Sequence, residues 1–236
     1  MKLAAFCFIL PLGLLLSARA DLTIVQKVEG GGQGADMTIK IKGDKARIEA
    51  SPQLTMIVDA KTGEIIHLMN DQKTVVHMSA EKMKAAMDTL NKFNGKDETA
   101  AKPKLTATGK KESINGYETE QYVYETPSFK AVYWIAPKYP NASAILKQLE
   151  VLNSGTWNSK SNAMPDYADF PGLPIKFVVT AGGNQVTTTV TAIKEDSLSD
   201  SEFTVPKDFQ ELKAPEMKLG SPQDEVSPAA ESSPKP

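Results

Sequence analysis

The sequence predicts a mainly β (α+β) fold: a curved antiparallel sheet that forms an incomplete β-barrel, with about two helices covering its concave face. Short segments of alternating apolar and polar residues recur along the chain and are separated by tight-turn residues. Two longer stretches have helical periodicity instead. Strands joined by such short connections are antiparallel neighbours, and a sheet of about ten strands tends to curl. A closed lipocalin-like barrel is the alternative, but it accommodates two internal helices less well.

Six strands are expected in the first half of the chain, at residues 22–28, 37–41, 45–50, 54–59, 64–69 and 73–78. Glycine, asparagine and aspartate lie between them and tolerate the positive φ that tight hairpins require. Met37, Ile39 and Ile41 alternate with Thr38 and Lys40, which indicates a strand with one buried face.

A helix is expected next, with Ser79 as its N-cap and Asn94-Gly95 at its end. Its apolar face consists of Met83, Ala86, Met87, Leu90 and Phe93. A second helix is expected from a cap at Asn141 to Leu152. An irregular stretch that carries aromatic residues follows the second helix, over residues 153–174.

The strands of the second half are expected at residues 105–111, 118–124, 131–136, 175–180 and 185–193. Asn115-Gly116 is the clearest hairpin signal in the chain, because this pair suits a type I′ turn. It predicts that the first two of these strands are paired.

Residues 1–20 have the pattern of a secretory signal peptide. Lys2 is followed by the apolar run Leu3–Leu16, and Ala18-Arg19-Ala20 predicts cleavage after Ala20. The single cysteine, Cys7, lies within this signal, so no disulfide is expected in the mature chain. The mature protein is therefore expected to be periplasmic or secreted, with no transmembrane segment.

Residues 21–213 are long enough for a single domain with a well-buried core. Residues 214–236 are rich in proline, serine and glutamate and contain no aromatic residue. Such a composition cannot bury enough apolar surface to offset the entropy of ordering, which predicts a disordered tail.

Charge and motifs argue against two large functional classes. The chain has 27 basic and 29 acidic residues, whereas nucleic-acid-binding proteins normally have a strong basic excess. No nucleophile elbow, zinc-protease pair or phosphate loop occurs, so neither an enzymatic activity nor a cofactor is expected. His67 and His77 lie near methionines and could bind copper, but the repeated histidine or methionine patterns of such sites are missing. Asp166 and Asp169 are better explained as a chance pair than as glycosidase carboxylates.

Four short motifs stand out along the chain: Arg47-Ile48-Glu49, the turn Ile114-Asn115-Gly116-Tyr117, Tyr133-Trp134-Ile135, and Phe203-Thr204-Val205-Pro206 followed by Phe209. Together they resemble an uncharacterised family of exported bacterial proteins, which is similar to the periplasmic lipoprotein-sorting carriers of the Lol type. The resemblance implies an incomplete antiparallel barrel whose helix-covered cavity takes up acyl chains in the carriers. Related proteins of this fold sense envelope stress or bind other partners. The carriers also use a specific arginine to hold a closed state, a role that the sequence does not assign to Arg47.

The function that follows is a non-enzymatic periplasmic binding module, a carrier or envelope sensor, that holds an apolar ligand such as an acyl chain or a lipoprotein. Methionine suits surfaces that repack around varied apolar ligands, although the methionines by themselves favour ordinary core packing, and the resemblance to the carriers is what supports a cavity. The candidate lining residues are Met37, Ile39, Met56, Val58, Met83, Met87, Leu90, Trp134 and Phe177. The alternative function is an envelope interaction protein with a packed core, which binds a protein partner through a sheet edge.

Overall fold

The computed structural model describes residues 20–30, 34–93, 103–126, 129–153 and 165–212, so nearly all of the predicted signal peptide and the whole of the predicted tail lie outside the described residues. One twelve-stranded sheet dominates the fold, in the order β12-β6-β5-β4-β3-β2-β1-β11-β10-β9-β8-β7. Its strands are β1 (Asp21–Gly30), β2 (Ala35–Lys42), β3 (Lys45–Ser51), β4 (Leu54–Asp59), β5 (Glu64–Met69), β6 (Thr74–Met78), β7 (Thr106–Ile114), β8 (Tyr117–Thr126), β9 (Phe129–Ala136), β10 (Leu173–Ala181), β11 (Asn184–Asp196) and β12 (Gln210–Leu212).

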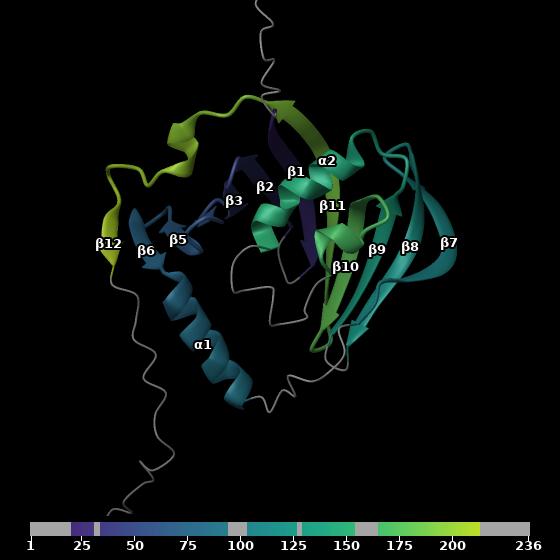
Figure 1. The fold of residues 1–236 in the computed structure, drawn as a ribbon, viewed down its shortest axis with the longest axis horizontal. Coiled ribbons are helices and arrows are strands. Elements are labelled where there is room, and N and C mark those ends of the chain that lie inside the picture. The colour runs from purple at the N-terminus through teal and green to yellow at the C-terminus, as the bar shows by residue number, and fades with distance from the viewer. Residues whose placement is uncertain (1–19, 31–33, 94–102, 127–128, 154–164, 213–236) are drawn as a thin grey trace, which may run out of the picture.

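The sheet consists of two antiparallel meanders, β1 to β6 and β7 to β11, joined by the pairing of β1 with β11. It curves around the second helix and does not close into a barrel (Figure 1). The predicted fold class is therefore confirmed. All eleven strands expected from the sequence are present, whereas the twelfth, β12, was not predicted. β12 pairs with β6 in parallel, which departs from the expected all-antiparallel sheet.

The helices are α1 (Ala80–Phe93) and α2 (Ala142–Leu149), with the 3-10 turns η1 (Glu150–Asn153), η2 (Tyr167–Asp169) and η3 (Asp200–Phe203). The predicted cap of α1 is confirmed, because the Lys82 N–H donates to Ser79 Oγ at 3.3 Å. The predicted position of the α2 cap is confirmed, since Asn141 is the N-cap residue, with φ 54°. Its side chain makes no capping bond, however, and its Nδ2 donates instead to Glu195 Oε1 at 3.3 Å.

The main core lies on the concave side of the sheet. Ile145, Leu146 and Leu149 form the buried face of α2 and belong to the same cluster as the inward-facing strand residues. Met83 of α1 is buried in this cluster too. From the strands, the cluster includes Leu22, Ile24, Ile39, Ile41, Ala46, Val58, Ile65, Tyr124, Tyr133, Ile135 and Ile175.

Residues 197–209 run along the convex side of the sheet to the edge strand β12, and we call residues 197–212 the C-terminal strap (Figure 1). Glu202 on the strap accepts from Lys40 Nζ at 2.6 Å, and its carbonyl oxygen accepts from Arg47 Nη1 at 3.0 Å. Further along the strap, Val205 and Phe209 pack against a second, smaller cluster, formed by Ile57, Leu68 and Val75. The strap therefore covers apolar residues that would otherwise face solvent on this half of the sheet.

The Asn115-Gly116 turn is confirmed and has a second role. Both residues have positive φ, 51° and 80°, as a type I′ turn requires. Asn115 Nδ2 also donates to the carbonyl oxygen of Val190 on β11 at 2.8 Å. The register between β1 and β11 shifts beside Val190, where a bulge interrupts regular backbone pairing. The turn residue thus supplies a hydrogen bond to β11 at the irregular point of the central strand pair.

Replacing Asn115 tests this contact. Asn115→Gly keeps a residue that tolerates positive φ but removes the side-chain donor. We expect a loss of about 0.5–1.5 kcal/mol in the free energy of unfolding, measured by urea denaturation. Gly43→Asn is the control, since Gly43 also has positive φ at a hairpin. An Asn115→Gly protein as stable as its parent would contradict the role of this bond.

Two truncations test the boundary of the domain. Ending the mature chain after Lys213 should leave its melting temperature almost unchanged. Ending it after Asp196 removes the strap, uncovers Ile57, Leu68 and Val75, and should lower the melting temperature by many degrees. Equal melting temperatures for the two truncated proteins would contradict a structural role for the strap.

Candidate functional site

The strand register brings four of the candidate lining residues together on the concave face between β2 and β4. Ile39 pairs with Ile48, and Ile48 pairs with Met56. Val58 occupies the adjacent row, opposite Ala46. Met37 lies one row further along β2, opposite Gln26 of β1.

Burial changes from row to row across this face. The row Leu22, Ile41, Ala46, Val58 and Ile65 is buried throughout. In the next row, Ile48, Met56, His67 and Val76 on β3 to β6 are only half-buried, and we call these four residues the open row. The concave face therefore has an apolar strip that the described helices leave partly uncovered.

The remaining candidates are distributed differently. Phe177 lies on the concave side, where its ring centroid is 5.9 Å from that of Tyr133. Trp134 is not brought together with them, because alternation along β9 turns it away from the face that carries Tyr133 and Ile135. Lys176 Nζ lies 4.6 Å from the centroid of its ring. The side chains of Met87 and Leu90 lie outside the described residues.

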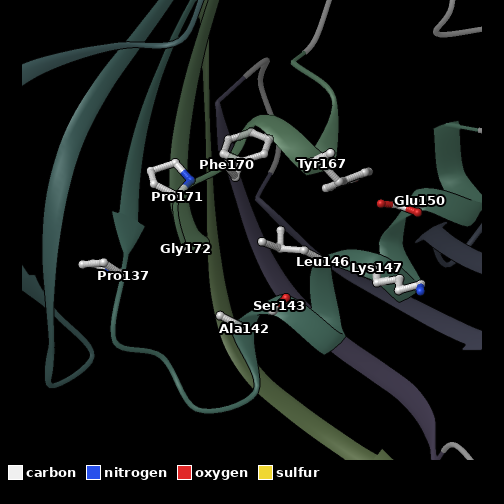
Figure 2. A pocket seen from close by; sticks show the side chains of 11 residues that line it. Pro137, Ala142, Ser143, Leu146, Lys147, Glu150, Tyr167, Phe170, Pro171 and Gly172 are labelled. Carbon is white, nitrogen blue, oxygen red and sulfur yellow. The ribbon is translucent and has the colours of Figure 1, made fainter.

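A pocket with a volume of about 460 Å³ lies between α2 and residues 167–172, which contain η2 and which we call the η2 segment. Figure 2 shows Leu146 of α2 and Phe170 and Tyr167 of the η2 segment around it, with Lys147 and Glu150 toward one side. Its lining residues are Pro137, Ala142, Ser143, Leu146, Lys147, Glu150, Tyr167, Ala168, Phe170, Pro171 and Gly172. None of them is among the candidate residues predicted from the sequence.

Gly172 explains how the η2 segment reaches this position. A Cβ atom at residue 172 would lie 2.5 Å from the carbonyl oxygen of Ala136 and 2.5 Å from Cα of Pro137. Only glycine permits this approach of β10 to the end of β9. The segment then sets Phe170 edge-on against Tyr133, with ring centroids 5.1 Å apart. The sequence signal was the group of aromatic residues in an otherwise irregular stretch.

Burial dominates the electrostatics of the concave side. It lowers the pKa of His67 in the open row below its usual value of 6.5. Burial also raises the pKa of the Tyr133 hydroxyl, and it raises the pKa of Tyr167 to about 12. Both tyrosines therefore stay protonated and uncharged at neutral pH.

Neither a metal site nor a membrane-spanning helix is found in the described part of the chain. No three histidine, cysteine, aspartate or glutamate side chains there are grouped closely enough to bind a metal ion. No described helix has the length and hydrophobicity needed to cross a bilayer.

An open, curved sheet with a helix in its concave side defines a half-barrel, the class of fold that the sequence motifs predicted. Residues 21–209 match the family described as "Domain of unknown function (DUF4412)". The chain belongs to this family, which confirms the predicted membership of an uncharacterised family. No curated protein matches the chain.

Three solved structures illustrate what the fold is similar to. PNGF-II is 14% identical with a TM-score of 0.41, over 83% of this chain and 32% of that one. The chain thus spans about a third of the length of PNGF-II. The Mycobacterium tuberculosis lipoprotein LppX is 10% identical with a TM-score of 0.38, over 78% of this chain and 91% of LppX. A chain of the Pseudomonas aeruginosa MucA/MucB complex is 10% identical with a TM-score of 0.41. The match covers 80% of this chain and 57% of the chain in that complex.

The lowered pKa of His67 predicts how stability depends on pH. The unfolded chain takes up this proton at a higher pH than the folded protein, so acid favours unfolding. We expect the parent to lose stability as pH falls below about 6.5 and His67→Gln to lose less over the same range. Urea unfolding at a series of pH values measures both slopes. Parallel slopes for the two proteins would contradict the burial of His67.

Proposed function

We propose that this chain is a non-enzymatic binding module, exported to the bacterial periplasm, that holds an apolar ligand such as an acyl chain on the concave side of its sheet. The observation that carries the proposal is the pocket between α2 and η2, with Leu146, Tyr167 and Phe170 in its walls. Its volume of about 460 Å³ falls within the range of about 300–1,000 Å³ that is typical of small-molecule sites. The charged side chains of the lining, Lys147 and Glu150, are exposed.

The open row gives the proposal a second, independent support. Ile48, Met56 and Val76 of the open row are half-buried, so an apolar ligand in contact with them would remove more of their surface from water. A methionine side chain has three rotatable bonds and can repack around chains of different shape. Met37, Ile39, Met56, Val58, Met83 and Phe177 thus remain proposed lining residues, and Trp134 does not because of its position on the convex face.

Export is supported by the position of β1. The first strand begins at Asp21, the residue that follows the predicted cleavage site. Asp21 Oδ2 accepts a hydrogen bond from the N–H of Leu198 at 2.8 Å, so the new N-terminal residue would be held by the strap. We propose that residues 1–20 are a cleaved signal and that residues 21–213 form one domain.

The alternative function, partner binding through a sheet edge, is less well supported. At one edge, Thr106–Ser113 of β7 are exposed, and the strand is interrupted by a register shift and carries Lys110 and Lys111. Such charges and irregularities discourage pairing with another strand. At the other edge, β12 has only three residues. Short edge strands offer little backbone for an added partner.

Filling the pocket tests the proposal. Ser143 is exposed and lines the pocket, whereas its exposed neighbour Ala144 on the same helix does not. We expect the mature protein to bind the fluorescent apolar probe N-phenyl-1-naphthylamine, and Ser143→Trp to weaken binding at least tenfold. Ala144→Trp should bind the probe as the parent does, and both variants should melt near the parent's temperature.

Two results would overturn the proposal. One is a parent protein that does not bind the probe at concentrations well below those at which the probe aggregates. The other is equal weakening by Ser143→Trp and Ala144→Trp, which would mean that the probe binds elsewhere.

A further inference from the structure

The pocket between α2 and the η2 segment combines apolar surface with two charges of opposite sign. Leu146, Phe170 and Pro171 provide apolar surface. Lys147 of α2 and Glu150, the first residue of η1, also line the pocket and lie toward one side of it (Figure 2). Ligand pockets are mostly apolar and carry a few polar groups that fix the orientation of the ligand. The two charged residues are therefore the part of the lining that selects a head group.

The two charges lie next to each other because the backbone continues as a helix from one to the other. Glu150 has φ −55° and ψ −25°, so the helical turn that begins in α2 includes it. Residues three positions apart on a helix share one side of it, with Cβ atoms about 5–6 Å apart. A ligand in the pocket thus meets a positive and a negative side chain in adjacent positions.

Neither charge is neutralised by the protein. Among the residues that the structure describes, neither side chain forms an ion pair with the other or with a third residue. The order of the two residues explains the first point, since lysine before glutamate is the less favourable orientation for pairing along a helix. The acids of the neighbouring turn, Asp166 and Asp169, do not line the pocket. Both charges are therefore available to a ligand.

We propose that the pocket takes an acyl-chain amphiphile with a zwitterionic head group, whose anionic group lies at Lys147 and whose ammonium group lies at Glu150. The inference rests on the proposed function, since it names the head group of the ligand held at that site. A head group with a single charge would meet one attractive and one repulsive side chain, whereas a zwitterion gains from both. Phosphoethanolamine has this chemistry, because two carbon atoms separate its phosphate from its ammonium group. Lysine binds phosphate as a compact point charge.

The test compares three probes that share a twelve-carbon chain and differ in charge. They are dodecylphosphoethanolamine, the anion methyl dodecyl phosphate and the cation dodecylammonium. Each probe competes with N-phenyl-1-naphthylamine for the mature protein, below the concentration at which it forms micelles. We expect the parent to bind the zwitterion at least threefold more tightly than either singly charged probe, because exposed ion pairs contribute modestly.

Two neutralising substitutions should shift these affinities in opposite directions. Lys147→Gln should weaken binding of the zwitterion and the anion about threefold and strengthen binding of the cation. Glu150→Gln should weaken binding of the zwitterion and the cation and strengthen binding of the anion. Lys207→Gln and Glu211→Gln are the matched controls, since both residues are exposed and neither lines the pocket. The controls should bind all three probes as the parent does.

The outcomes separate this inference from the proposed function. If the parent does not bind N-phenyl-1-naphthylamine, the proposed function fails. If it binds this probe but the three competitors displace it equally well, only the head-group inference fails. Equal changes of all three affinities in Lys147→Gln or in Glu150→Gln would overturn it too, and so would control variants that behave like these two.

Discussion

The pairing of β1 with β11 is the interaction on which the rest of the structure depends. It extends from Asp21 opposite Asp196 to Gly30 opposite Val186 and joins strands from the two ends of the domain. Without it the two meanders would be separate sheets, each with an unpaired strand and an uncovered apolar face. Because the paired residues are far apart in sequence, loop-closure entropy must be overcome before the pairing contributes stability. The Asn115 side chain supports this pair at the bulge, where regular backbone pairing is interrupted.

The two faces of the sheet have different roles. On the convex face, Arg47 bonds both Glu49 and the backbone of Glu202, so the strand motif Arg-x-Glu is tied directly to the segment that begins the closing Phe203–Pro206 motif. Ion pairs with Lys40 and Lys42 fix the strap further. Ion pairs near the surface contribute little individually, so the apolar contacts of Val205 and Phe209 with the second cluster account for most of the strap's stabilisation. The strap thus covers the convex face of the first meander, opposite the open row on its concave face.

The fold could be predicted from local signals because alternation, turn residues and helical periodicity all indicate the same architecture. Asn115-Gly116 specifies its hairpin through backbone conformation alone. β12 has no such signal, since three exposed residues show no alternation between buried and exposed positions. The pocket could not be located, because it depends on Gly172 packing against the end of β9, a contact between segments distant in sequence. Trp134 and Tyr133 are adjacent aromatic residues, and only the register of the neighbouring strands determines which of them faces inward.

Native mass spectrometry of the mature chain, purified without detergent from its own host, tests the central claim most directly. An interior that holds an acyl-chain amphiphile predicts a second charge-state series. Its excess mass should match one such molecule, be released by collisional activation, and be lost in the Ser143→Trp variant. A single series at the mass of the polypeptide alone, in preparations that remain folded, would contradict the account. Such a result would mean that the half-barrel has a packed interior and holds no ligand.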